Sequence, residues 1–300
     1  MAKPTTCPKA RSCMSARSTT PAPRLRNWRP TPRDARPRQI RRFNRKMIRW
    51  FKNLRRHSVR SAYGREILNA DVAHYRQLSP VKQQMLCELT QLFVSKTRWE
   101  GCAGLTVTFD MQVVIAAQAC LLLLGLDYDY YRHVRLILVY PDVYRGPIEI
   151  IRPLRNVIQS DVPRQGEAWF RGPVVLSWAS ALAGSRNAAD GHNVVIHEFA
   201  HKLDFHDGRR DGAPLLPHQA AMRWWRQVMT TAYEKLIDDA ERGRATLLDK
   251  YGATNPREFF AVATEAFFER PRELQRTHTD VYNALRGYFA QDLASWRLPY

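Results

Sequence analysis

The chain has 300 residues, of which 45% are hydrophobic and 11% aromatic, enough for one large or two small domains with a substantial core. It carries 47 Lys and Arg residues against 28 Asp and Glu residues, a net charge of +19. Residues 1–46 hold +13 of this charge and residues 47–66 another +5, so residues 67–300 carry only +1. The composition excludes a fibrous or wholly disordered chain, and the charge distribution argues against a basic nucleic-acid-binding fold.

The apolar runs and the cysteines predict a protein without a membrane span that belongs in a reducing compartment. The longest apolar run covers residues 113–126 and is interrupted by Gln118. It falls short of the roughly 18 residues that a membrane span needs, and it favours a buried core helix. The cysteines are odd in number and form no C-x-x-C pair, which suits a reducing compartment better than a disulfide scaffold. They are Cys7, Cys13, Cys87, Cys102 and Cys120.

Residues 1–46 form a basic, Arg/Pro-rich extension that cannot build a core, since they contain seven prolines and no glycine. We predict that it is disordered, and three interpretations remain open. It is an arm that binds nucleic acid or a membrane surface, a solvated tail without a partner, or sequence upstream of a true start at Met47. The third is supported by Met47, Ile48 and Phe51, which are spaced as on one helix face. Contacts with polyanions are expected only within residues 1–66.

The next elements in chain order are two helices and four short strands. Residues 78–96 have a helical apolar period that begins with Ser79 and Pro80, and residues 111–124 predict an apolar helix. Alternating or β-branched runs predict strands at 105–109, 134–140, 148–152 and 172–178. Pro173 favours an edge position for the last of these strands.

After residue 190 the pattern is helical almost to the C-terminus, which predicts an α+β fold with helices packed against one small mixed sheet. The first of these C-terminal helices has Asp190 or Asn193 as its N-cap and Gly208 as a stop signal. Its apolar residues recur at helical spacing and predict a buried stripe. They are Ile196, Phe199, Ala200 and Leu203.

This helix carries the motif H-E-x-x-H at residues 197–201, the strongest chemical signal in the chain. Residues four apart on a helix are neighbours, so His197 and His201 can present two imidazoles to one zinc ion at about 2.0–2.1 Å. Glu198 then lies beside the metal without binding it, where a base can take a proton from water. The alternatives are a structural metal site and an accidental match.

A catalytic zinc needs a third protein ligand and one open position. No cysteine lies downstream, but Glu258 and Glu265 are seven residues apart on a helix predicted between Asn255 and Pro271. Spacing does not decide between the two glutamates. Glu258 also fits a capping box with Asn255, whereas Glu265 could be a ligand, an acceptor for a histidine N–H, or exposed.

Seven segments together resemble the Mlc titration factor A family of gluzincin-like metallopeptidases, whose site is similar to that of lethal-factor-type proteases. The resemblance covers residues 47–300 and implies a single zinc metallopeptidase domain with a zincin-like fold and one Zn²⁺ per chain. Residues 1–46 have no counterpart in that family. The segments are HEFAHKLD at 197–204, YGATNPREFFAV at 251–262, YP at 140–141, QGEAW at 165–169, GPVVLSW at 172–178, YFAQD at 288–292 and MIRW at 47–50.

The resemblance also implies roles for single residues. The family's glutamate ligand matches Glu258, which favours it over Glu265. Tyr251 matches a tyrosine that donates a hydrogen bond to the tetrahedral intermediate, although a packed loop aromatic is the alternative. Asp204 matches the extension of the family's motif and could orient an imidazole, act as a cap or pair with Lys202. The family is aminopeptidase-like, acts in the bacterial cytoplasm and binds the glucose-responsive repressor Mlc.

These observations predict zinc-dependent hydrolysis of peptides. His197, His201 and Glu258 hold the metal, Glu198 transfers protons, and Tyr251 helps to stabilise the oxyanion. An extended substrate is expected to add to the strand at 172–178 through its candidate residues Val174, Val175, Leu176 and Ser177. The competing hypothesis is a non-catalytic protein that sequesters a repressor and keeps a vestigial or regulatory zinc site.

Overall fold

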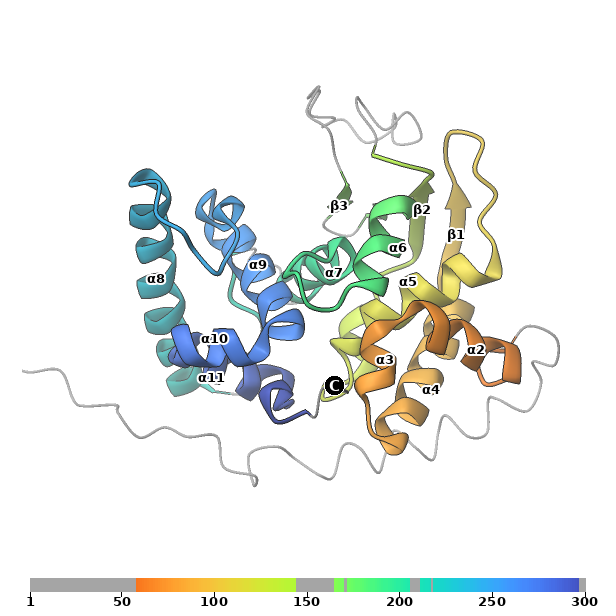
Figure 1. Cartoon of the computed structure of the whole chain (residues 1–300), viewed down its shortest axis with the longest axis horizontal. Helices are drawn as coiled ribbons and strands as arrows, with labels where there is room; N and C mark the ends of the chain where they lie inside the picture. The colour runs from red at the N-terminus through yellow and green to blue at the C-terminus, as the bar shows by residue number, and fades with distance from the viewer. Residues whose placement is uncertain (1–57, 144–164, 170–171, 206–210, 217, 297–300) are drawn as a thin grey trace, which may run out of the picture. The chain divides into compact units, whose positions relative to one another are not determined.

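The computed structural model describes residues 58–143, 165–169, 172–205, 211–216 and 218–296 (Figure 1). The basic extension, the predicted helix start at Met47 and the predicted strand at 148–152 lie outside these residues. The first half contains α2 (Ala62–Asp71), α3 (Ala73–Gln77), α4 (Pro80–Lys96), β1 (Arg98–Gly101), α5 (Phe109–Leu121), η2 (Tyr128–Tyr131) and β2 (Leu136–Tyr140). The second half contains β3 (Gly166–Ala168), β4 (Val174–Ser177), α6 (Trp178–Arg186), α7 (Val194–Asp204), α8 (Gln219–Glu241), η5 (Lys250–Ala253), α9 (Pro256–Glu269), α10 (Pro271–Thr277), α11 (Thr279–Phe289) and η6 (Leu293–Ser295).

The described strands form one small mixed sheet in the order β1-β2-β4-β3. Strand β2 pairs in parallel with β1 and with β4, where Ile137 lies opposite Val174. Strand β3 runs antiparallel to β4, with Glu167 opposite Val175. The fold is therefore mixed α/β with a four-stranded sheet, in agreement with the predicted class.

The predicted edge position of the strand around Pro173 is wrong, because β4 pairs on one side with β2 and on the other with β3. Pro173 lies just before the first paired residue of β4, so its missing N–H removes no ladder bond. The four residues predicted to receive a substrate strand are buried between two neighbours and have no free edge. They are Val174, Val175, Leu176 and Ser177.

The strand predicted at 105–109 is also absent from the described structure, and β1 takes its place upstream. The chain turns at Ala103 and Gly104, which both have positive φ, and returns so closely that a Cβ at Gly101 would collide with the carbonyl of Leu105. Thr108 then caps α5 by accepting a hydrogen bond from the Met111 N–H at 3.3 Å. The alternation at 105–109 thus belongs to a return segment and a helix cap.

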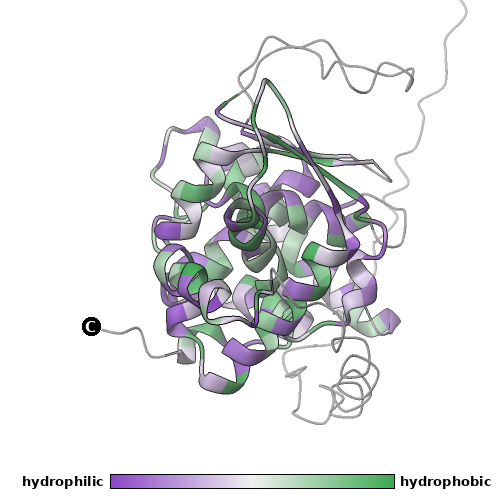
Figure 2. Cartoon of the chain, turned by 90° about the vertical axis from the view of Figure 1, so that its right-hand side faces the viewer, coloured by the Kyte–Doolittle hydropathy of each residue, from purple (hydrophilic) through white to green (hydrophobic). Residues whose placement is uncertain are grey.

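The two helices predicted in the first half are confirmed as α4 and α5. Helix α5 is buried from Val113 to Leu121, because α2, α4, α6 and α7 pack around it. Green hydrophobic and purple hydrophilic stretches share the same helices in Figure 2, as expected for helices with one buried face. None of the described helices is long and apolar enough to cross a membrane.

The sheet divides its buried side chains between two clusters. Ile137, Val139, Val174 and Leu176 join the main core that the helices build. Leu138 and Val175, on the alternate positions, form a smaller cluster on the other face with Cys102. Helix α7 contacts both β3 and β4 on one side and α9 on the other, so it lies between the sheet and the C-terminal helices (Figure 1).

Candidate metal site

Helix α7 carries both histidines of the motif and begins at a well-formed cap. The Asn193 side chain accepts a hydrogen bond from the Ile196 N–H at 3.0 Å, so Asn193 rather than Asp190 is the N-cap. The helix ends at Asp204, and Gly208 lies outside the described residues. The predicted stripe of Ile196, Phe199, Ala200 and Leu203 is fully buried.

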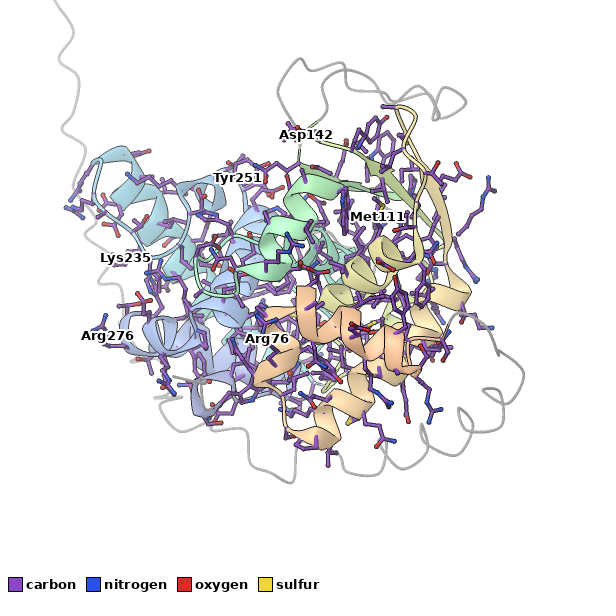
Figure 3. The ribbon with its side chains drawn as sticks, turned by 45° about the vertical axis from the view of Figure 1, so that its right-hand side comes forward. Arg76, Met111, Asp142, Lys235, Tyr251 and Arg276 are labelled. Carbon is purple, nitrogen blue, oxygen red and sulfur yellow. The ribbon has the colours of Figure 1, made fainter. Side chains whose placement is uncertain are left out.

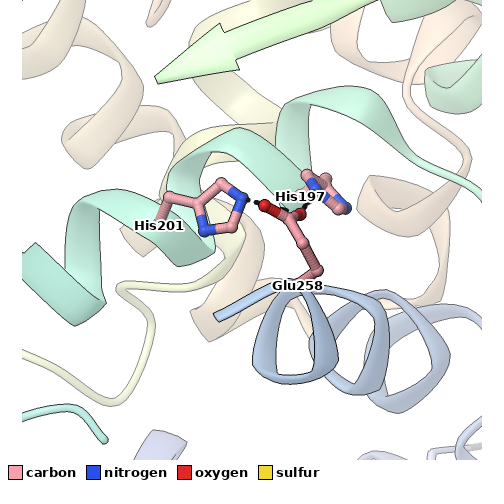
Figure 4. Close-up of side chains that lie close together, drawn as sticks. All are labelled: His197, His201 and Glu258. Atoms are coloured by element: carbon pink, nitrogen blue, oxygen red, sulfur yellow. Dashed lines mark hydrogen bonds and ion pairs between the residues drawn. The ribbon is translucent and has the colours of Figure 1, made fainter. Parts of the chain in front are cut away.

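Helix α9 brings a glutamate to these histidines. Asn255 caps the helix by accepting hydrogen bonds from the N–H groups of Arg257 and Glu258 at 3.0 and 3.1 Å. The Glu258 carboxylate points to α7 instead of back to the cap. Its Oε2 lies 3.0 Å from His197 Nε2 and 3.2 Å from His201 Nε2 (Figure 4).

These three side chains offer one donor atom each, all within 4.8 Å of one another. Two imidazole nitrogens and one carboxylate oxygen match the three protein ligands that a catalytic zinc takes. No other group of three His, Cys, Asp or Glu side chains in the described part of the chain brings its donors this close. The residues therefore fit a single zinc ion.

The side chains at this site shift one another's pKa values. Burial disfavours the charged form of His197, but hydrogen bonds to Glu258 and Glu265 outweigh it and raise its pKa well above the ordinary value. Burial alone would raise the pKa of Glu258, yet its bonds with His197 and His201 lower it. The pKa of His201 is lowered, chiefly by burial. Glu258 is thus held as an anion, the form in which a carboxylate binds metal.

Glu265 lies on the other side of the His197 ring. Its Oε1 is 2.8 Å from His197 Nδ1, and its Oε2 accepts a hydrogen bond from the Asn193 N–H at 2.6 Å. Because Glu258 faces Nε2 of the same ring, the two glutamates that spacing could not separate occupy different positions. Of the alternatives open for Glu265, an exposed position is excluded, because the residue is 6% exposed and faces the ring nitrogen of His197 that Glu258 does not.

Glu198 is buried between α7 and strand β3. It is 6% exposed, and burial raises the pKa of its carboxyl to about 8, partly countered by the positive charge of His197. Gly166 of β3 lies so close that a Cβ there would stand 2.7 Å from Glu198 Oε1. A carboxyl with such a pKa is suited to exchanging protons near neutral pH.

Tyr251 lies at the solvent side of the site, with 56% of its surface exposed (Figure 3). Its ring centroid is 6.1 Å from that of His197. Asp249 fixes the start of η5 by accepting a hydrogen bond from the Tyr251 N–H at 2.7 Å. The exposure of Tyr251 is not that of a packed loop aromatic.

Asp204 is fully buried, and its carboxylate has no hydrogen-bond partner among the described residues. Burial raises its pKa to about 6, and the nearby N–H groups of Gly212 and Ala213 act in the opposite direction. Lys202 does not pair with Asp204, since its Nζ donates to the carbonyls of Trp169 at 2.6 Å and Gly172 at 2.9 Å. Two of the three alternatives for Asp204, a pairing with Lys202 and a bond to an imidazole, are not found among the described residues.

Comparison with known proteins identifies the family. The profile of the glucose-regulated metallo-peptidase M90 family matches residues 42–290. The chain belongs to this family. An uncharacterized protein of Synechocystis is 40% identical over 225 residues, 74% of this chain and 82% of that protein. Mlc titration factor A of Klebsiella pneumoniae (strain 342) is 32% identical over 218 residues, 72% and 81% of the two chains. Mlc titration factor A of Pectobacterium atrosepticum is 30% identical over 229 residues, which are 73% of this chain and 84% of that protein.

Two features of this M90 metallopeptidase site escape prediction from the sequence. Gly166 occurs in a segment that predicts no strand, and its contact with Glu198 depends on tertiary structure. The buried amide of Gln118 binds the side chain of Asn193 at 3.0 Å. The one available signal was Gln118 itself, a polar residue that interrupts an otherwise apolar helix.

Proposed function

We propose that the chain is a zinc-dependent peptidase of aminopeptidase type with a zincin-like fold, acting in the cytoplasm on peptides. The observation that carries this proposal is the approach of His197, His201 and Glu258 from two separate helices to a shared point. In this proposal the three side chains hold one Zn²⁺ per chain. Bound zinc supplies a lowered pKa, toward about 7, for a water molecule and a positive charge for the carbonyl oxygen of the substrate.

The chain's own residues supply the remaining steps. Glu198 accepts the proton of the attacking water and later transfers it to the leaving amine, a task that its raised pKa favours. Tyr251 donates a hydrogen bond from its phenol to the developing oxyanion, and its exposure keeps the phenol accessible to substrate. Glu265 accepts the Nδ1–H of His197 and leaves Nε2 for the metal.

The substrate backbone is proposed to add to β3 and not to β4. Among the described strands, β3 pairs only with β4 and therefore has one unpaired side. The same strand contacts Glu198 through Gly166. A peptide extended along this side would gain main-chain hydrogen bonds and lie near the proposed base.

The test combines metal analysis with one substitution. The purified chain is expected to contain about one zinc ion and to cleave chromogenic amino-acid amides. Glu198→Gln removes the proton acceptor at nearly constant shape, so zinc content should persist while turnover falls by about 10²-fold or more. Glu234→Gln, an exposed glutamate on α8, is the matched control and should retain full turnover. A fully active Glu198→Gln variant would refute the mechanism.

A second function, binding of the Mlc repressor, is proposed from the names of the relatives. Several curated relatives are called Mlc titration factor A, including those of Klebsiella pneumoniae and Pectobacterium atrosepticum. If sequestration is the main function, the Glu198→Gln variant should retain a repressor from the same organism in a pulldown as well as the unmodified chain does. Absence of retention by either chain would contradict this second proposal.

A further inference from the structure

We propose that Asn193 and Gln118 are positioning residues for the metal site, which fix the ring of His197 through a buried chain of hydrogen bonds. The inference rests on the proposed zinc site and extends it to residues that touch neither metal nor substrate. Both side chains are almost completely buried, with 1% and 0% of their surface exposed. Polar groups at such positions are costly unless every donor and acceptor is satisfied.

The first step of the chain joins the His197 ring to the cap of its own helix. Glu265 binds His197 Nδ1 with one oxygen and the Asn193 N–H with the other. One turn further along α9, Glu269 accepts a hydrogen bond from the Gly191 N–H at 2.9 Å. Two carboxylates of α9 thus hold the turn that precedes α7, and the position of Glu265 depends on where that turn lies.

The second step fixes Asn193. Its side-chain oxygen accepts from the Ile196 N–H, while its Nδ2 donates to Gln118 Oε1 at 3.0 Å and to the Gly184 carbonyl at 3.2 Å. A Cβ on Gly184 would stand 3.2 Å from the Asn193 amide, so this glycine permits the close approach of α6. One side chain therefore connects the start of α7 with α5 and α6.

The third step fixes Gln118. Its Nε2 donates to the carbonyls of Val114 and Ala181, both at 3.1 Å, which leaves Oε1 to accept from Asn193. The orientation of each amide in the chain is thereby determined by its partners.

The direction of these bonds has a chemical consequence at the metal site. A backbone N–H can only donate, so the Asn193 N–H requires Glu265 to accept with Oε2. With Glu265 facing Nδ1 as an acceptor, Nδ1 of His197 keeps its proton, and the proton that Nε2 shares with Glu258 is the one a metal would displace to reach the Nε2 lone pair. Imidazole binds zinc through such a lone pair.

The experiment measures zinc affinity of the full chain by competition with a chromogenic chelator. Gln118→Met keeps the volume but removes the acceptor for Asn193, and we expect zinc binding about tenfold weaker, the lower end of the range for outer contacts of a metal site. Glu265→Ala should weaken it by about 10–100-fold. Ser61→Ala, which removes the N-cap of α2, is the control for a cap loss elsewhere and should leave zinc affinity unchanged.

A double-mutant cycle separates positioning from general destabilisation. If Gln118 acts through Glu265, Gln118→Met should change zinc affinity less than twofold in the Glu265→Ala background, while both substitutions still lower the unfolding midpoint. Should Gln118→Met fail to fold, Asn193→Ser keeps a cap oxygen but loses both Nδ2 bonds, and it takes its place in the cycle.

Three outcomes can be distinguished. Coupled losses of zinc affinity support the proposal. Unchanged zinc affinity in the variants, or losses that simply add, would overturn it while leaving the zinc site intact. An unmodified chain that binds no zinc would overturn the proposed function and this inference with it.

Discussion

Glu198 and Gly166 lie in contact although they are far apart in the chain, and this contact limits what position 166 can hold. An ideal Cβ at Gly166 would stand 2.7 Å from Glu198 Cγ and Oε1, and equally close to Val194 Cγ2. Real Cβ atoms do not approach so closely, so either strand β3 or the carboxylate of Glu198 must shift. Glycine here permits a backbone to approach a functional side chain.

We therefore expect Gly166→Ala to impair turnover more than folding. The shift should misplace Glu198 and lower turnover of chromogenic amides by at least about tenfold, since small displacements of reacting groups are costly. Overpacking should lower the free energy of unfolding by about 1–3 kcal/mol. Zinc content should remain near one per chain. Gly104→Asn, at a position with open space around it, is the control; equal turnover in both variants would contradict the argument.

His74 provides a prediction about pH. The side chain is 1% exposed, and its Nε2 lies 3.2 Å from the Phe268 carbonyl. Burial lowers its pKa from 6.5 to about 4, against the effect of that carbonyl. Between these two pKa values the unfolded chain binds a proton at His74 that the folded chain does not. The contribution of His74 to the free energy of unfolding is therefore fully present above pH 6.5 and is lost as the pH falls toward 4.

The loss attributable to His74 is at most about 3 kcal/mol, from the difference between the two pKa values. His74→Gln keeps a donor for the Phe268 carbonyl but cannot be protonated. Urea unfolding at pH 7 and pH 4 should show that the variant loses less stability on acidification than the unmodified chain. Equal losses in both chains would assign the acid sensitivity to other groups.

The sequence predicted which residue types form the site better than it predicted which atoms each of them contacts. The motif at 197–201 and the helix with Glu258 and Glu265 predicted the side chains that lie together in the structure. Spacing alone could not separate the two glutamates, because residues seven apart share a helix face. Their distinct positions depend on how α9 packs on α7, which is a tertiary property.

At the scale of elements, α7 is linked to the sheet by a buried lysine. Lys202 donates from Nζ to the carbonyls of Trp169, just after β3, and Gly172, just before β4. The side chain is 6% exposed, and burial lowers its pKa to about 8, opposed by the negative charge of Glu198. This contact holds the antiparallel pair of β3 and β4 against α7.

Replacement of Lys202 by Met should loosen this strand pair locally. Methionine preserves the apolar stem but leaves the Gly172 carbonyl without the donor, at a cost of about 1–3 kcal/mol. We expect hydrogen exchange of amides in β3 and β4 to accelerate by at least about tenfold, while amides in α5 keep their protection. Uniform acceleration across the chain would indicate a global loss of stability instead.

Helices and strands were predictable from the sequence where their own apolar periodicity matches the face that they bury in the fold. Strand β2 and helices α4 and α5 have strong periods and were found. Strand β1 was missed, because the sequence Arg-Trp-Glu-Gly has no apolar alternation and its pairing with β2 comes from the sheet. The position of β4 inside the sheet was mispredicted from Pro173, which stands outside the paired residues.

At the scale of the whole molecule, most of the net positive charge precedes the candidate site residues in the sequence. Residues 1–46 carry +13 of the net +19, whereas the family match begins at residue 42. The candidate metal site is built entirely from α7 and α9, with η5 alongside. A role for the basic extension is therefore separable from a role for the site.

We expect a chain that begins at Met47 to keep its zinc content and its turnover of amino-acid amides. If the extension is a nucleic-acid-binding arm, the full chain should bind DNA with an affinity that falls steeply with salt, and the shortened chain should lose that affinity. Salt-dependent binding that persists without residues 1–46 would assign it to the body of the protein. Loss of zinc on shortening would show that the extension supports the fold.

The three carboxylates on α9 also determine where the chain can change in length. Glu258, Glu265 and Glu269 recur at intervals of two turns and one turn, so a single inserted residue between them would rotate the later ones by about 100°. The stretch from α8 to η5 contributes no atom to the donor cluster. Length variation among relatives should therefore accumulate between α7 and η5 and be absent from within α9.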